Sequence, residues 1–196
     1  MVKYDKIIVY GSGKMFRKLE ILDEKEKILR ETSKTVDFPL SKKDKETIER
    51  IITHLTYSQI EEFSEKYGLR PGMGLAFPQL GELKRIIVIV YEYEEGKFEN
   101  YVFINPKIIS HSEEMVALET GEGCLSVNRE VEGHVPRFAR VTINGYDVDG
   151  NKISIRAREE LAVAFQHEID HLNGILFFDK INKNKPLYTE DEIRLI

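Results

Sequence analysis

Apolar and polar positions follow a helical period in one early part of the chain. Between residues 48 and 67, apolar side chains recur every three or four positions, which is typical of a helix with one buried face. Ser41 is suited to begin this helix, because Pro39 lies just before it and Asp44 follows three residues later. The pattern predicts a helix that starts at Ser41 and continues, after a bend, to Gly68.

The middle of the chain has the composition of a sheet. Residues 85–93 and 101–109 are rich in β-branched and aromatic side chains, and the polar residues 94–97 between them suit a hairpin connection. Residues 113–119 predict another short strand.

A second hairpin and a second helix follow. Residues 141–148 and 152–157 alternate between apolar and polar side chains on either side of an Asp-Gly turn at 149–150. Apolar residues at 161–165 then lead into a helix that is expected to end near Gly174. We therefore expect an α+β fold in which antiparallel strands pack around this long helix.

The first thirty residues carry weaker signals. Residues 7–10 predict a short strand, and the glycines at 11–14 invite comparison with a phosphate-binding loop. The spacing excludes such a loop, because its first glycine would fall on Ile8 and its hydroxyl residue on Met15. A turn is expected instead, and the charged residues 14–30 predict a solvated helical segment.

Composition and charge restrict the class of protein. The 196 residues, 41% of them hydrophobic, suffice for one well-packed domain spanning 1–196. A net charge of -5, from 29 basic and 34 acidic residues mixed along the chain, argues against direct DNA binding and against anionic membranes. The longest apolar run, 86–91, is far shorter than the roughly 20 residues of a membrane helix. With no signal-peptide core and a single cysteine, which cannot form an internal disulfide, the chain is expected to be soluble and cytoplasmic.

One pattern in the second helix carries chemistry. His167, Glu168 and His171 form His-Glu-x-x-His, and at about 3.6 residues per turn the two imidazoles share one helix face and can bind one metal ion. Glu168 would then reach a metal-bound water as a general base. The spacing predicts a catalytic metal site with a third protein ligand and one position open for water.

The third ligand separates the possible enzyme classes. Phe177 occupies the position at which one protease class has a third histidine, and it cannot bind a metal ion. Glu190 or Glu192 would serve in a zinc endopeptidase, although the tail that carries them is short and polar. Cys124 lies in a stretch that is rich in glycine. A noncatalytic protein with a structural metal is a further alternative, but it would leave Glu168 without a role. Three other histidines have no nearby ligand partner and are interpreted as structural or exposed: His54, His111 and His134.

Three short motifs resemble those of the peptide deformylase family. Residues 122–126 resemble the family's E-G-C-L-S motif, and residues 167–171 resemble its H-E-x-D-H motif. Residues 72–79 resemble its G-x-G-L-A-A-P-Q motif, except that Phe77 stands where the family usually has alanine. The ring of Phe77 either narrows the nearby pocket wall or packs inward with a structural part, and the motif leaves both alternatives open. The resemblance runs from about residue 26 to about residue 186, so residues 1–25 form an N-terminal extension outside it.

The resemblance implies a role for each motif. The metal ligands would be Cys124, His167 and His171. Glu168 would be the general base, and the Gln79 side-chain amide and the Leu125 backbone N–H would stabilise a tetrahedral oxyanion. Five further residues would contact the substrate, three in the methionine pocket and two through the backbone: Met73, Val163 and Ala164, then Gly74 and Gly123.

The resemblance also implies a reaction and a cofactor. The enzyme would hydrolyse the N-formyl group of formyl-methionyl nascent peptides, releasing formate and a free N-terminus. The cofactor would be one divalent metal ion; the ligand set alone suits Zn²⁺, whereas the family commonly uses Fe²⁺, with Zn²⁺, Ni²⁺ or Co²⁺ able to substitute. The ribosome is a candidate partner, although residues 189–192 are acidic and some family members dock through a basic C-terminal helix.

Overall fold

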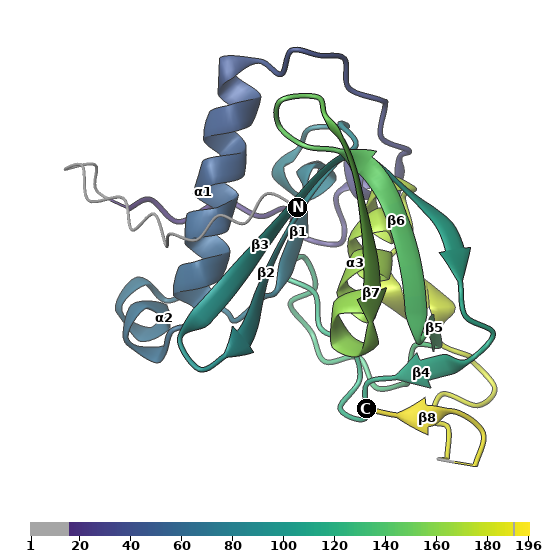
Figure 1. Ribbon diagram of the computed structural model, residues 1–196. Helices are drawn as coiled ribbons and strands as arrows, with labels where there is room; N and C mark the ends of the chain where they lie inside the picture. The colour runs from purple at the N-terminus through teal and green to yellow at the C-terminus, as the bar shows by residue number, and fades with distance from the viewer. Residues whose placement is uncertain (1–15, 190) are drawn as a thin grey trace.

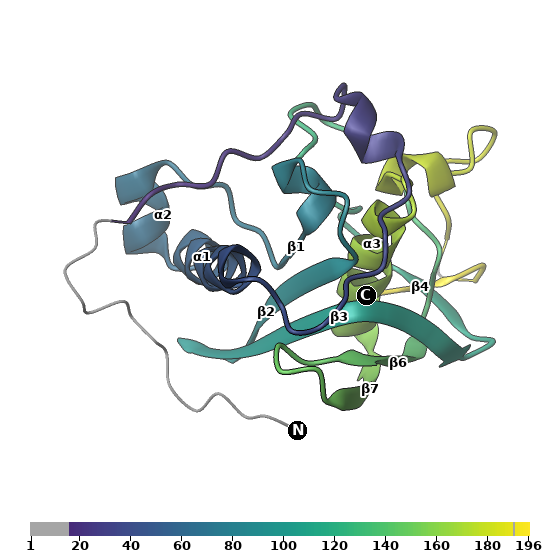
Figure 2. The ribbon, with the colours of Figure 1, turned by 90° about the horizontal axis from the view of Figure 1, so that it is seen from above.

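The fold is a twisted antiparallel sheet with helices on one side. The computed structural model describes residues 16–189 and 191–196 (Figure 1). The larger sheet has five strands in the order β1-β2-β3-β6-β7, and the smaller has three in the order β5-β4-β8. Seen from above, α1 and α3 lie on the same side of the larger sheet (Figure 2). α1 packs on β2, and α3 packs on β1, β2 and β7. This arrangement is the α+β fold that the pattern predicts.

The elements have the following bounds. The strands are β1 (Gly74–Ala76), β2 (Ile86–Glu94), β3 (Lys97–His111), β4 (Met115–Ala117), β5 (Arg137–Phe138), β6 (Arg140–Tyr146), β7 (Lys152–Arg158) and β8 (Arg194–Leu195). The α-helices are α1 (Lys42–Ser58), α2 (Glu61–Tyr67) and α3 (Glu159–Leu172), and the short 3₁₀ helices are η1 (Lys27–Arg30), η2 (Phe77–Leu80) and η3 (Phe177–Lys180).

The predicted early helix is confirmed and is divided into α1 and α2. Ser41 is the N-cap, since its Oγ accepts a hydrogen bond from Asp44 N at 3.1 Å. The apolar stripe is buried against the sheet, with Ile51 and Leu55 fully inaccessible to solvent. Gly68, in the left-handed conformation with φ of 57°, ends α2 as predicted.

Both predicted hairpins are confirmed. β2 pairs antiparallel with β3 around a turn that contains Gly96, whose φ is 70°. β6 pairs with β7 in register from Arg140 opposite Arg158 to Tyr146 opposite Lys152. β2 lies between β1 and β3, and its five consecutive residues 86–90 are all buried, so both faces of the strand are covered. This burial explains its unbroken apolar run.

The predicted helix at 14–30 is wrong for the residues that the structure describes. Residues 16–26, here called the N-terminal strap, are extended or in turns, and only the short η1 follows. Apart from a turn in which Glu26 N donates to Asp23 O at 2.9 Å, backbone groups of the strap bond to other segments, as when Leu19 N donates to His54 Nδ1 at 3.2 Å. Leu19 and Leu29 are also buried, at 5% and 0% exposure, which a solvated helix would not require. The strand predicted at 7–10 and the turn at 11–14 fall outside the described residues.

The smaller sheet lies near the N-terminal end of α3, where Arg194 of β8 pairs with Glu159. The predicted strand at 113–119 is confirmed as β4, which pairs antiparallel with β5 and parallel with β8. Ile196 N donates to Ala117 O at 2.9 Å and Glu119 N donates to Ile196 O at 2.9 Å, so the end of the described chain is tied to β4. Within the described ranges, no helix is long and apolar enough to cross a membrane.

Candidate metal centre

α3 presents His167 and His171 side by side on one face. Their ring centroids lie 5.0 Å apart, as expected for residues one helical turn apart. Both residues are buried or nearly so within the fold. The helix ends as predicted, at Leu172, and Gly174 has a φ of 73°. A β-carbon at Gly174 would lie 2.5 Å from Arg30 O, so glycine there also permits close packing of the chain around η1.

Cys124 is brought against this pair of histidines. Its Sγ lies 3.3 Å from His171 Nε2, and one donor atom from each of the three residues lies within 4.8 Å of the others. Glu192, the alternative ligand, instead accepts a hydrogen bond from Thr189 N at 3.0 Å and pairs with Lys185. Glu190 lies outside the described residues. The geometry therefore favours cysteine over a glutamate from the tail.

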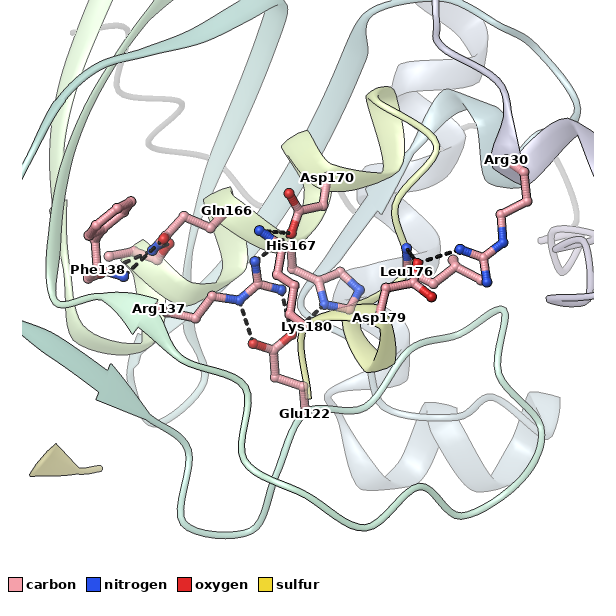
Figure 3. A network of polar contacts seen from close by, with 11 residues as sticks. Arg30, Glu122, Arg137, Phe138, Gln166, His167, Asp170, Leu176, Asp179 and Lys180 are labelled. Carbon is pink, nitrogen blue, oxygen red and sulfur yellow. Dashed lines mark hydrogen bonds and ion pairs between the residues drawn. The ribbon is translucent and has the colours of Figure 1, made fainter. Parts of the chain in front are cut away.

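A buried ion-pair network fixes the orientation of His167 (Figure 3). Glu122 Oε2 lies 2.8 Å from His167 Nδ1, and Arg137 donates to both oxygens of Glu122 at 2.7 and 2.9 Å. Arg137, only 1% exposed, also pairs with Asp170, which lies 3.2 Å from Lys180 Nζ. Burial by itself raises the pKa of Glu122, but the hydrogen bonds from His167 and Arg137 outweigh it and lower that pKa to about 2. With Nδ1 held by a carboxylate, Nε2 of His167 is the free ring nitrogen, an arrangement typical of metal-binding histidines.

Glu168 is buried beside the three donor atoms. It is 4% exposed, and its Oε2 has no hydrogen-bond partner among the residues that the structure describes. Burial raises the pKa of Glu168 to about 7, because a carboxylate is poorly solvated there. A carboxyl group that titrates near neutrality suits a residue that both accepts and returns a proton.

Gln79 lies on η2 with its side chain fixed at both ends. Its Oε1 accepts a hydrogen bond from Ala76 N at 2.9 Å, which leaves Nε2 to point at the site. Nε2 lies 3.2 Å from Ser126 Oγ and 3.6 Å from Cys124 Sγ. The amide N–H₂ of Gln79 is therefore aimed at the region of the sulfur.

Arg70 orients the loop that carries Cys124 and Leu125. Its guanidinium donates to the carbonyl oxygens of Cys124 at 3.1 Å and Val127 at 2.9 Å, and also to that of Leu125. Because a trans peptide holds C=O and N–H on opposite sides, the Leu125 N–H points away from Arg70. The next N–H along, that of Ser126, lies 3.4 Å from Cys124 Sγ, on the side away from the arginine.

A pocket of about 950 Å³ opens over these groups. Its walls include all five predicted substrate-contacting residues, together with residues from the metal cluster. Those five are Met73, Gly74, Gly123, Val163 and Ala164. Gly123 leaves open space, since a β-carbon there would have no described atom within 4 Å.

Comparison with known proteins identifies the family. Residues 18–187 match the family model described as polypeptide deformylase. The chain belongs to the polypeptide deformylase family. The peptide deformylase of Oceanobacillus iheyensis is 49% identical over 167 residues, which cover 85% of this chain and 91% of that protein. Peptide deformylase 2 of Bacillus cereus is 43% identical over 173 residues, covering 88% and 94%.

Solved structures of deformylases have the same fold. A plant peptide deformylase, PDF1B, superposes with a TM-score of 0.71 at 29% identity, covering 87% of this chain and 84% of that one. The peptide deformylase of Thermotoga maritima gives a TM-score of 0.67 at 30% identity, covering 85% and 99%. The α+β fold and the resemblance to deformylases are thereby confirmed, and the endopeptidase alternative is not favoured.

The departure from the deformylase motif at Phe77 does not reach the pocket. Phe77 is fully buried, packs in the core between α1 and the sheet, and is absent from the described residues that line the pocket. Of the two alternatives for Phe77, a structural residue that packs inward agrees with this position. On η2 the side chain of residue 77 faces the core while that of Gln79 faces the metal centre, so the two positions of one motif serve different surroundings.

The other histidines of this deformylase lie apart from the metal cluster. His54 is buried and accepts a hydrogen bond from Leu19 N, and His134 Nδ1 accepts one from Tyr188 N at 2.9 Å. His111 is exposed and stacks on Phe138 with 3.6 Å between ring centroids. Each has the structural or exposed role that the sequence indicates.

Arg70 and Arg137 are functional candidates that sequence reasoning missed. Neither lies in one of the three motifs, and an arginine has no spacing signal of its own. For Arg137, the one available signal was the pair of acidic residues inside the motifs, Glu122 and Asp170, because buried carboxylates require a cationic partner.

Proposed function

We propose that this deformylase-family chain removes the N-formyl group from formyl-methionyl peptides at the start of newly made polypeptides, releasing formate. The main support is that donor atoms of Cys124, His167 and His171 lie within 4.8 Å of one another. Two of these residues, Cys124 and His167, line an open pocket together with the buried carboxyl group of Glu168. Family membership supplies the reaction class, a metal-dependent hydrolysis of a linear amide.

We assign Cys124, His167 and His171 as ligands of one divalent metal ion. The donor set fits, because one thiolate and two imidazoles make a common three-ligand catalytic site, and because His167 already has its second nitrogen bound to Glu122. Fe²⁺ is the proposed ion, with Zn²⁺, Ni²⁺ or Co²⁺ able to substitute. When bound, such an ion supplies Lewis-acid activation of water and carbonyl groups.

Glu168 is proposed as the general acid and base. Its unpaired Oε2 would take a proton from the attacking water and later give it to the leaving amine, so that one carboxyl group serves both halves of the reaction. A pKa near neutrality supports both transfers. Water and the formamide give formate and the protonated amine, so that atoms and charge balance.

Gln79 and Leu125 are proposed as oxyanion donors. The Gln79 Nε2–H group lies 3.6 Å from Cys124 Sγ, and the Leu125 N–H, which is opposite the Cys124 carbonyl bound by Arg70, would face the same region, where the formyl oxygen would lie. Donors that are held in place before the reaction stabilise developing negative charge without reorganising, and losing one typically costs about 10² to 10³ in rate.

The remaining pocket residues would bind the peptide. Met73, Val163 and Ala164 give an apolar wall for the methionine side chain, which is flexible and fits such surfaces well. Gly74 and Gly123 would let the peptide backbone approach closely. Since formylated chains begin at the ribosome, we place the reaction in the cytoplasm, with the ribosome as a possible further contact.

Formate release from formyl-Met-Ala-Ser, measured with protein purified and loaded with Fe²⁺ without oxygen, tests the proposal. Formate release in equal amount with a new N-terminal amine, with no such amine formed from the acetyl peptide, supports it. The Cys124→Ser variant should lose both metal and activity. Cleavage of internal peptide bonds, or full activity in Cys124→Ser, would point to the endopeptidase instead.

A further inference from the structure

The N-terminal strap touches both loops that carry the proposed oxyanion donors. Leu22 N donates to Gln79 O at 2.9 Å, and Glu24 N donates to Ser126 O at 2.7 Å. In Figure 2 the strap is the purple segment that crosses the upper edge of the molecule before η1. Two segments from distant parts of the chain are thus bridged by strap residues that are two positions apart.

The side chains of the strap hold the segment that follows Ser126. Glu24 accepts two hydrogen bonds from Arg129, Nε to Oε1 at 2.8 Å and Nη2 to Oε2 at 3.1 Å, and Asp23 accepts one from Asn128 at 2.8 Å. The Arg129 guanidinium also lies 4.9 Å from the ring centroid of Phe178, on η3. A bidentate pair of this kind fixes the plane of the guanidinium as well as its position.

The held segment is a wall of the pocket. Val127, Arg129, Glu130 and Val131 line the pocket, whereas Asp23 and Glu24 do not. Residues 127–131, here called the wall segment, lie in neither helix nor strand. Since no regular hydrogen-bond ladder supports this backbone, its position depends on side-chain contacts such as those to the strap.

We infer that Glu24 is a positioning residue for substrate binding: through Arg129 it holds the wall segment in the place that a bound peptide requires. The inference rests on the proposed function, since it names a residue that acts on the same pocket from behind. Glu24 touches no pocket surface, so any effect of its loss on peptide binding must pass through the wall segment. It also gives part of the N-terminal region a function.

Kinetics of the metal-loaded enzyme provide the first test. Glu24→Gln keeps the shape of the side chain and weakens the pair, so KM for formyl-Met-Ala-Ser should rise about threefold or more while kcat and metal content stay near wild type. Arg140→Gln is the matched control, because Arg140 pairs with Glu114 at 2.7 Å, is 54% exposed against 53% for Arg129, and lies outside the pocket lining. It should leave KM unchanged.

Coupling between the two residues provides the second test. The double variant Glu24→Gln/Arg129→Gln should raise KM no more than Arg129→Gln alone, because both changes break one pair. The exchanged pair Glu24→Arg/Arg129→Glu should recover part of the loss. Additive effects, an unchanged KM in Glu24→Gln, or an equal rise in Arg140→Gln would overturn the inference.

Amide hydrogen exchange gives a readout that does not depend on activity. In Glu24→Gln the amides of the wall segment should exchange faster, while those of β2 and β3 keep their protection. If wild-type protein released no formate, the proposed function would fail, yet exchange would still report whether Glu24 holds the wall segment. Unchanged exchange at 127–131 would refute the positioning role.

Discussion

Gly74 and Glu168 are in a contact that a side chain at position 74 would prevent. A β-carbon on Gly74 would lie 2.4 Å from Glu168 Oε1 and 2.8 Å from its Cγ. The motif at residues 72–79 therefore supplies the space in which the Glu168 carboxylate, from the motif at residues 167–171, lies. This relationship explains the glycine by packing within the protein, in addition to any approach of a peptide.

Gly74→Ala should damage catalysis more than folding. The added methyl group forces the buried Glu168 carboxylate to move, and small misplacements of a catalytic group cost about 10²-fold in rate. We expect kcat to fall by at least about tenfold with metal content preserved. Formate release and metal analysis on the same preparation check this, and a wild-type kcat would show that Glu168 has room to adjust.

Glu168→Gln should abolish proton transfer while leaving metal binding intact. The amide keeps the shape of the carboxylate but accepts no proton, so turnover should fall by about 10² or more, the usual contribution of general acid–base catalysis. Metal content should stay near wild type, since the ligands proposed here are other residues. Activity near wild type would remove Glu168 from its assigned role.

Phe77→Ala should destabilise the protein without changing substrate choice. The ring is fully buried in the core between α1 and the sheet, and truncating a buried phenylalanine costs about 3 to 5 kcal/mol. Denaturant unfolding measures this loss. The relative kcat/KM values for formyl peptides with different first residues should match wild type, and a broadened profile would mean that Phe77 does shape the pocket.

The identity of the bound metal should set the lifetime of the enzyme in air. Cys124 lines the open pocket, and a thiolate bound to redox-active iron can be oxidised to sulfenic and sulfinic acid, which hold metal poorly. Iron-loaded protein should lose activity within hours, whereas zinc, which has no redox chemistry, and nickel should preserve it. Activity assays on one apo preparation loaded with each metal, with mass spectrometry at Cys124, check this. Equal lifetimes would argue against the proposed ligand set.

His54 should make stability depend on pH below neutrality. Burial, with Lys18 and Arg50 nearby, lowers the pKa of His54 from the usual 6.5 to about 4. The unfolded chain therefore binds this proton below about pH 6.5 while the folded protein does not, so stability is full above that pH and declines toward pH 4. Between pH 7 and 5, Tm should fall more in wild type than in His54→Gln. Parallel pH profiles would contradict the expectation.

The sequence predicted the fold and the pairing of two histidines on one helix face because both rest on local spacing. His167 and His171 are one helical turn apart in any helix, and the alternation in β6 and β7 is visible residue by residue. Arg137 was missed because its partners, Glu122 and Asp170, lie 15 and 33 residues away. Contacts of that kind depend on tertiary structure, which periodicity does not encode.

The strap and Phe77 also depend on tertiary contacts that could not be predicted from the sequence pattern. Charged residues before η1 suggested a solvated helix, yet the segment is extended because its N–H groups find acceptors on distant loops such as Gln79 O. Phe77 lies in a motif that forms the site, and its position in the motif gave no indication that its ring faces the core. Direction of a side chain within an irregular segment is decided by packing, not by composition.

The separation between Glu24 and Arg129 also orders events during folding. The two residues are 105 positions apart, so their pairing closes a long loop, and the entropy of that closure is lost before the contact contributes anything. The β2–β3 hairpin, by contrast, joins neighbouring residues and needs no such closure. We therefore expect the pocket wall to be completed after the β2–β3 hairpin. On this expectation, the ability to bind a peptide matures later than the local structure of the sheet.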